Sequence, residues 1–237
     1  MIVGSKRWHL HLRKGASLFG VDLDDLSLQS FTRYAKELLI WNKKTNLTSI
    51  TDPYEIVEKH FIDSLAVYPY LTPYAYLLDM GTGAGFPGLT LKITLPNLKA
   101  TLIDASAKKI NFIKQVIRIL GLQNIQAQSI RAEDLSQRKT HNDKFEVVIC
   151  RAFSALDAFL DLALPLLTKG GIALAMKGKF PFNEIQAIGA VGDDPQYISW
   201  NNYHLKMDAY TYQLPFSHSQ RSLIRFTLLK HGNLEET

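Results

Sequence analysis

A glycine-rich turn between two apolar stretches limits the folds open to this chain. Residues 76–80, Tyr-Leu-Leu-Asp-Met, predict a short buried strand, and the turn Gly-Thr-Gly-Ala-Gly-Phe-Pro-Gly follows directly at 81–88. An apolar helix is predicted from about 87 to 94. Glycines let a backbone turn tightly and approach a ligand closely, and a helix N-terminus adds free N–H groups. This order predicts a parallel sheet with a ligand at its carboxyl edge.

The rest of the chain alternates between strand and helix patterns. Helices are expected at 106–120, with Gly121 ending the helix, and from the end of the fourth strand to about residue 167. Further strands are expected at 100–104, 124–129, 145–150 and 172–176, with two late strands at 197–199 and 223–229 closing one edge. Strands that alternate with helices predict right-handed crossovers. The expected fold is therefore α/β, a doubly wound, mostly parallel Rossmann-like sheet.

Helical patterns precede the sheet. Residues 24–41 carry apolar side chains at helical spacing, and a second helix begins at Asp52-Pro53-Tyr54-Glu55, where the aspartate can cap it and the proline suits its first turn. We expect residues 1–74 to form an N-terminal helical extension packed on the core. Residues 75–237 then form the ligand-binding domain.

Charge and composition restrict the partners. The net charge is +5, and residues 1–50 carry eight Lys or Arg against four Asp or Glu. This excess suggests a polyanionic partner such as nucleic acid. The single cysteine, Cys150, cannot form an internal disulfide, which favours a cytoplasmic location, and it is expected to pack in a strand. No membrane span is expected, and no Cys/His cluster has metal-ligand spacing.

Three ligands compete for the glycine turn. Leu89 stands where a P-loop needs lysine, so nucleoside triphosphate hydrolysis is disfavoured. Gly83-x-Gly85-x-x-Gly88 formally matches the dinucleotide fingerprint. Asp79, which ends the first strand, would repel a pyrophosphate but would attract the ammonium of S-adenosylmethionine (SAM). The residues favour SAM and leave a dinucleotide open.

Other candidate residues follow the later strands. Asp104 ends the second strand and can accept bonds from two ribose hydroxyls. Ala132-Glu133 follows the third strand, in the turn that lies beside the adenine in a doubly wound sheet. Arg151 follows the fourth strand and should emerge beside the ligand. His60 is expected to be structural or to contact a substrate.

Four segments together resemble the RsmG (GidB) family of bacterial ribosomal RNA methyltransferases. They are Trp41-Asn42-Lys43-Lys44-Thr45-Asn46-Leu47-Thr48, Lys59-His60-Phe61-Ile62-Asp63-Ser64, Asp79–Gly88 and Arg151-Ala152-Phe153. The resemblance covers about Leu28 to Lys230, less clearly over 178–222, and leaves out the first 20 residues. It implies methylation of N7 of a guanosine in 16S ribosomal RNA, with SAM as methyl donor.

The resemblance also implies roles for individual residues. Gly81 and Phe86 would line the SAM site, although some relatives have leucine in place of Phe86. Ala132 and Glu133 would lie on the adenine side. Arg151 would contact SAM, and Asp104 matches the acidic end of the second strand.

The chemistry of guanine N7 sets the expected mechanism. This nitrogen has a free lone pair and no proton to lose, so no general base is expected and alignment should dominate. Asn46, His60 and Asp63 are the candidates for positioning the substrate. The basic N-terminal helices and Lys108, Lys109 and Lys114 are candidate contacts to 16S RNA or the small ribosomal subunit, with a solvated helix face as the alternative for the lysines.

Two other functions stay open at this point. One is an NAD-dependent oxidoreductase, and the other is a non-catalytic RNA-binding protein with the same fold. A monomer is adequate for any of these functions.

Overall fold

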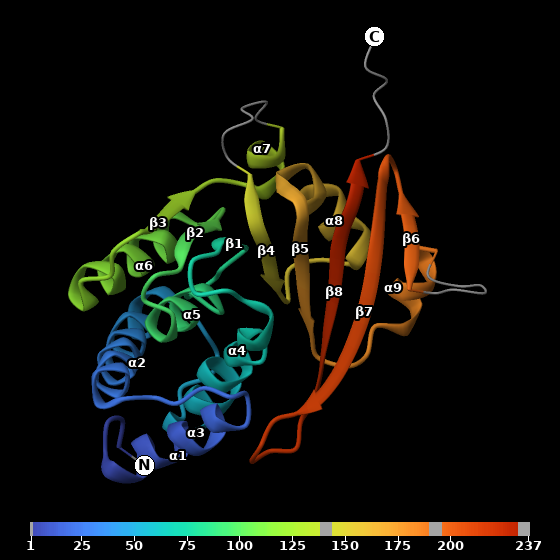
Figure 1. The fold of residues 1–237 in the computed structure, drawn as a ribbon. Coiled ribbons are helices and arrows are strands. Elements are labelled where there is room, and N and C mark those ends of the chain that lie inside the picture. The colour runs from blue at the N-terminus through green and yellow to red at the C-terminus, as the bar shows by residue number, and fades with distance from the viewer. Residues whose placement is uncertain (1, 138–143, 190–195, 232–237) are drawn as a thin grey trace.

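A computed structural model describes residues 2–137, 144–189 and 196–231 of the chain, with no account of the His231 side chain. Its strands form one sheet in the order β3-β2-β1-β4-β5-β8-β7-β6 (Figure 1). The strands are β1 Tyr76–Met80, β2 Lys99–Asp104, β3 Ile125–Ser129, β4 Phe145–Arg151, β5 Leu167–Lys177, β6 Tyr197–Trp200, β7 Tyr203–Gln213 and β8 Gln220–His231.

The first five strands run parallel, and β1 lies between β2 and β4. Residues 77–80 of β1 are buried because helices cover both faces of this part of the sheet. A strand buried on both faces reads as a continuous apolar run, which explains the pattern at residues 76–80. The predicted doubly wound, mostly parallel α/β fold is confirmed.

Helices form two layers around the sheet (Figure 1). One core lies between the sheet, α5, α6 and the N-terminal helices, and the other lies beneath α7, α8 and α9. The helices are α1 Lys6–Ser17, α2 Asp25–Thr45, α3 Pro53–Glu55, the π-helix η1 Ile56–Ile62, α4 Asp63–Leu65, η2 Tyr68–Tyr70, α5 Gly88–Thr94, α6 Ala107–Leu120, α7 Ala132–Ser136, α8 Leu156–Ala163, η3 Leu164–Leu166 and α9 Phe182–Ala187.

The N-terminal helices begin at the capping residues that the sequence marks. Asp24 accepts a hydrogen bond from Ser27 N, and Asp52 accepts from Tyr54 N and Glu55 N. Phe31 and Tyr34 of α2 are completely buried in the core that this helix shares with α5 and α6. The division of the chain at residues 74 and 75 stays a prediction.

The C-terminal part of the sheet differs from the sequence prediction. The segment Tyr203–Gln213 forms a long strand, β7, that was not predicted. The two predicted late strands, β8 and β6, do extend the sheet beyond β5, but β7 lies between them and only β6 is the edge strand on that side. Strand β5 begins at Leu167, five residues before the predicted start, because a register shift opposite 145–147 accommodates Gly170 and Gly171 within it.

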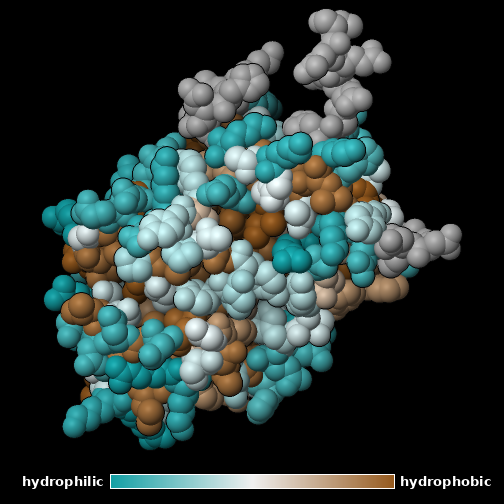
Figure 2. Space-filling view, viewed as in Figure 1, coloured by the Kyte–Doolittle hydropathy of each residue, from teal (hydrophilic) through white to brown (hydrophobic). Residues whose placement is uncertain are grey.

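One face of the molecule shows how polar and apolar residues share the surface. On the face seen in Figure 2, hydrophilic residues cover most of the surface and hydrophobic residues interrupt them. Among the described residues, no helix has the length and apolar character that crossing a membrane requires.

Candidate active site

The glycine turn is held in place by the aspartate that precedes it. Asp79 is fully buried at the end of β1, and its Oδ2 accepts from Thr82 Oγ1 at 2.6 Å and from Gly88 N at 2.7 Å. Burial raises the pKa of this carboxyl to about 7, although the two hydrogen bonds oppose the rise. The second oxygen, Oδ1, is buried without a partner in the described residues. One oxygen therefore organises the turn, and the other is free to meet a donor.

Two glycines of the turn have no substitute. Gly81 has φ +72°, and a Cβ there would lie 2.4 Å from the ring of Phe153. At Gly85, with φ +98°, a Cβ would lie 2.4 Å from the side chain of Leu89. The left-handed backbone and the close neighbours together require glycine. The ring of Phe153 and the side chain of Leu89 therefore pack directly against the backbone of the turn.

Asp104 connects the ends of β1 and β2. Its Oδ2 accepts from Gly83 N at 3.0 Å, its Oδ1 accepts from Ser106 N at 2.8 Å, and Lys109 Nζ lies 3.4 Å from Oδ2. Each carboxylate oxygen has two lone pairs, so Oδ1 keeps acceptor capacity, whereas Gly83 and Lys109 already occupy Oδ2. The side chain is 9% exposed, which leaves it within reach of a ligand.

A cavity of about 140 Å³ joins the carboxyl ends of β1, β2 and β3. Four of the predicted cofactor-binding residues line it, namely Gly81, Asp104, Ala132 and Glu133. Its other lining residues are Ile103, Ala105, Ile130, Arg131 and Phe153. We call it the Asp104 cavity. The sequence analysis named none of these five as a site residue, although Phe153 belongs to the Arg151-Ala152-Phe153 segment.

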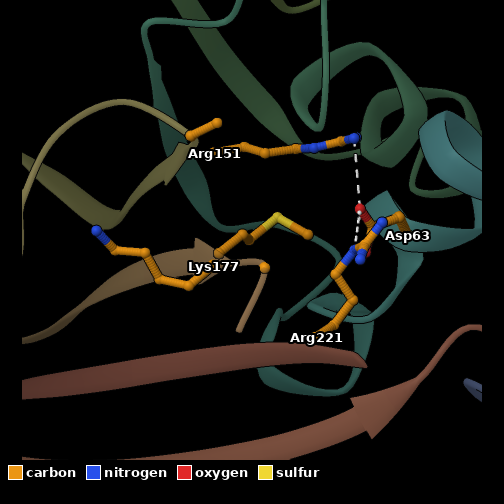
Figure 3. A pocket seen from close by; sticks show the side chains of 7 residues that line it. Asp63, Arg151, Lys177 and Arg221 are labelled. Carbon is orange, nitrogen blue, oxygen red and sulfur yellow. Dashed lines mark hydrogen bonds and ion pairs between the residues drawn. The ribbon is translucent and has the colours of Figure 1, made fainter. Parts of the chain in front are cut away.

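A second cavity of about 320 Å³ lies at the ends of β4 and β5, and we call it the Arg151 cavity. It is lined by Asp63, Arg151, Ala152, Met176, Lys177, Gly178 and Arg221, and Figure 3 shows it from close by. Ala152 has φ +50°, a left-handed turn that leaves Arg151 in this cavity and Phe153 in the other. The two cavities therefore lie on either side of one three-residue turn.

Arg151 is held by the N-terminal helices. Its Nη2 donates to Lys59 O at 2.5 Å and lies 3.4 Å from Asp63 Oδ2. Its Nη1 is buried without a partner in the described residues. A guanidinium left with a free, desolvated N–H can hold an anionic or carbonyl oxygen strongly.

Asp63 brings three distant parts of the chain together. Its Oδ2, which lies near Arg151 on β4, also accepts from Arg221 Nε on β8 at 3.2 Å. Its Oδ1 accepts from Tyr212 Oη on β7 at 2.8 Å. Figure 3 shows the two arginines on either side of Asp63. Burial raises the pKa of the Tyr212 hydroxyl, and the negative charge of Asp63 raises it further. Sequence reasoning missed Lys177, Tyr212 and Arg221, since nothing in their local pattern marks them.

His60 and Phe86 lie outside both cavities. Phe86 is buried between the ring of Tyr34, 5.3 Å away, and the ring of His60, 4.3 Å away and nearly parallel. His60 Nε2 bonds with Thr48 Oγ1 at 2.9 Å. Burial first, and then the charge of Arg151, lowers the His60 pKa to about 3, so the ring is neutral. The predicted contacts of Phe86 with SAM and of His60 with substrate remain predictions.

Asn46 is also apart from the cavities. It ends α2 with φ +48°, is exposed, and its N–H donates to Asn42 O. Cys150 is buried in β4, as expected, and burial raises the pKa of its thiol. Within residues 2–137, 144–189 and 196–231, no group of His, Cys, Asp and Glu side chains could hold a metal ion.

Solved structures share the fold. The O-methyltransferase from Bacillus cereus, solved in complex with SAH, aligns with a TM-score of 0.57 at 16% identity over 83% of this chain and 90% of its own. TrmN from Thermus thermophilus aligns with a TM-score of 0.53 at 15% identity over 73% of this chain and 53% of its own. At these identities the likeness shows the fold alone.

The sequence comparisons identify the family. The chain is 44% identical over 165 residues to ribosomal RNA small subunit methyltransferase G of Desulfitobacterium hafniense (strain Y51), covering 70% of this chain and 69% of that protein. It is 41% identical over 221 residues to the protein of the same name from Myxococcus xanthus (strain DK1622), covering 93% and 97%. The family model described as GidB, rRNA small subunit methyltransferase G, matches residues 27–192. This chain therefore belongs to the GidB family of methyltransferases.

Proposed function

We propose that this protein transfers a methyl group from SAM to N7 of a guanosine in 16S ribosomal RNA. The observation that supports this most is the pair of cavities on either side of the Arg151–Phe153 turn. A methyl donor in the Asp104 cavity and a base in the Arg151 cavity would meet at that turn. Relatives named ribosomal RNA small subunit methyltransferase G support ribosomal RNA as the substrate.

The side chains present fit SAM. One of its ribose hydroxyls can donate to Asp104 Oδ1, which keeps acceptor capacity at the cavity wall. Its ammonium matches the unpartnered, buried Oδ1 of Asp79. Gly81 presents its backbone to the same cavity, beside the ring of Phe153. When bound, SAM supplies an electrophilic methyl group on a positively charged sulfur.

The lining of the Arg151 cavity supports a reaction without a general base. Asp63 already accepts from Tyr212 and Arg221, and Lys177 is paired with Glu184 at 2.7 Å. Guanine N7 has no proton to lose, so none of these groups needs to take one. What remains for the protein is to orient the base and to exclude water.

The two arginines suit the acceptor side. Arg151 and Arg221 can donate to a guanine carbonyl or to a phosphate oxygen. Asp63 holds both guanidinium groups, so we assign it a positioning role that acts through them. Asn46 and His60 keep their proposed positioning roles from the sequence resemblance alone.

Surface lysines are the proposed contacts to the wider RNA. Lys108 and Lys114 of α6 are exposed, and Lys109 contacts Asp104 at the cavity. The positive charge of Lys109 thus shields the Asp104 carboxylate from the phosphates of an approaching RNA. We expect RNA binding by the wild type to weaken steeply as the salt concentration rises. After Lys108 and Lys114 are replaced by alanine, the dependence on salt should be less steep.

The function is tested by methyl transfer from labelled SAM to 16S RNA that lacks the modification, as naked RNA and as small subunits. We expect label at N7 of one guanosine, detected by the strand cleavage that reduced N7-methylguanosine permits. Label at another atom would contradict the N7 assignment. Binding of RNA without transfer would indicate a non-catalytic protein, and binding of NAD(H) in place of SAM would indicate an oxidoreductase.

A further inference from the structure

A third cavity, of about 210 Å³, adjoins the Arg151 cavity and has no role in the proposed reaction. Its walls come from the β7–β8 hairpin and from Phe180, which follows β5. Arg221 lines both cavities. We call this third space the Phe180 cavity. The two cavities therefore share one wall residue.

The side chains around it have the chemistry of base recognition. Phe180 is 44% exposed, which leaves a ring face open for stacking. Gln213 and Gln220 contribute exposed side-chain amides, which donate and accept hydrogen bonds as base edges require. Arg221 brings a positive charge that suits a phosphate. An aromatic face, amides and an arginine together match an unpaired nucleotide.

Ser222 points independently to a ligand. It lines the Phe180 cavity, is 1% exposed, and its hydroxyl is buried without a partner in the described residues. A buried hydroxyl without a hydrogen bond is costly, and such groups in native proteins are normally satisfied by something. A ligand in the cavity would supply the missing bond.

We propose that the Phe180 cavity binds an unpaired nucleotide of the RNA substrate, adjacent to the nucleotide that is methylated. Phe180 stacks on its base, and Arg221 contacts the phosphate between the two nucleotides. This assignment rests on the proposed function, because it takes the Arg151 cavity as the place of the reacting base. It extends that function to recognition of the sequence beside the target.

The primary test is equilibrium binding of unmodified 16S RNA, with methyl transfer as a second readout. Phe180→Ala should weaken RNA binding and raise the KM for RNA about 5- to 150-fold, the range that loss of one stacked base produces. Phe180→Trp should retain binding, and the affinity for SAM should stay unchanged in both variants. Phe182→Ala is the matched control, because Phe182 is 60% exposed on the same segment but does not line the cavity.

Ser222→Ala separates ligand binding from folding. It removes a hydroxyl that has no partner in the described residues, so the free energy of unfolding should not fall, whereas RNA binding should weaken. Equal RNA affinity of Phe180→Ala and Phe182→Ala would overturn the proposal. The binding measurement tests the nucleotide site even if the wild type transfers no methyl group. Absence of methyl transfer would count against the proposed function, and not against the nucleotide site.

Discussion

Asp63 Oδ2 lies 3.4 Å from Nη2 of Arg151, across the junction between the N-terminal helices and the end of β4. The same oxygen accepts from Arg221 on β8. The N-terminal helices and the β7–β8 hairpin therefore meet at the Asp63 carboxylate, whose side chain is 4% exposed. This contact helps to hold Arg151, the first residue of the turn between the two cavities.

Replacing Asp63 with asparagine should destabilise the protein and slow methyl transfer. Two guanidinium groups would lose their counter-charge in a mostly buried setting, which costs about 3 kcal/mol. Denaturant unfolding measures the loss of stability, and transfer at saturating SAM and RNA measures the effect on Arg151.

Asp25→Asn is the matched control for that change. Asp25 also pairs with an arginine, Arg13, at 2.6 Å, but its side chain is 85% exposed. An exposed pair contributes less than about 1 kcal/mol, so this variant should unfold nearly as the wild type does. Similar losses in the two variants would show that the Asp63 contacts do not hold the site.

Asp79 should make stability depend on pH. Its folded pKa, about 7, lies above the ordinary value of 3.8, so the folded state binds the proton more tightly than the unfolded state does. This contribution to stability is complete below the ordinary pKa and is lost as pH rises to about 7. Asp79→Asn still offers an oxygen to Thr82 and Gly88 but does not titrate. Unfolding free energies measured from pH 4 to 8 should therefore fall more for the wild type than for the variant; parallel curves would contradict the raised pKa.

The rate of methyl transfer should show no histidine step. His60 has a pKa of about 3 and is neutral throughout the physiological range. At saturating SAM and RNA, kcat should be constant from pH 6 to 8, because guanine N7 needs no base. The pH profile of His60→Gln should have the same shape. A fall in kcat below neutrality, with binding of SAM and RNA unchanged, would indicate an essential proton acceptor.

Gly81→Ala should weaken cofactor binding, whereas Gly121→Ala should only destabilise the fold. Both glycines have positive φ, +72° and +62°, so each substitution carries backbone strain of about 1–2 kcal/mol. A Cβ at Gly81 would collide with Phe153 at the cavity, but at Gly121 it meets nothing within 4 Å. Calorimetric titration with SAM should show at least a tenfold loss of affinity for the first variant alone. Equal affinity in both variants would remove Gly81 from the site.

The sequence pattern predicts the parallel half of the sheet and the Asp104 cavity, because local signals carry them. Buried strands read as apolar runs, and the ends of parallel strands bring Gly81, Asp104 and Ala132 to one edge. The antiparallel hairpin was harder to predict. Along β7 only Leu205 and Met207 are buried, so the strand lacks a clear apolar pattern.

The Arg151 cavity depends on contacts that no local pattern encodes. Asp63 meets Tyr212 and Arg221 across about 150 residues of chain, and only the folded hairpin brings them together. Phe86 is a related case. The family resemblance implies a SAM contact for this side chain, but Tyr34 and His60 enclose it on both faces.

A crystal structure of the protein grown with S-adenosylhomocysteine tests the account most directly. We predict the adenosine in the Asp104 cavity, its ribose on Asp104 and its adenine beside Ala132 and Glu133, with the amino acid portion directed toward Asp79. An empty Asp104 cavity, or the ligand bound elsewhere on the chain, would contradict the account.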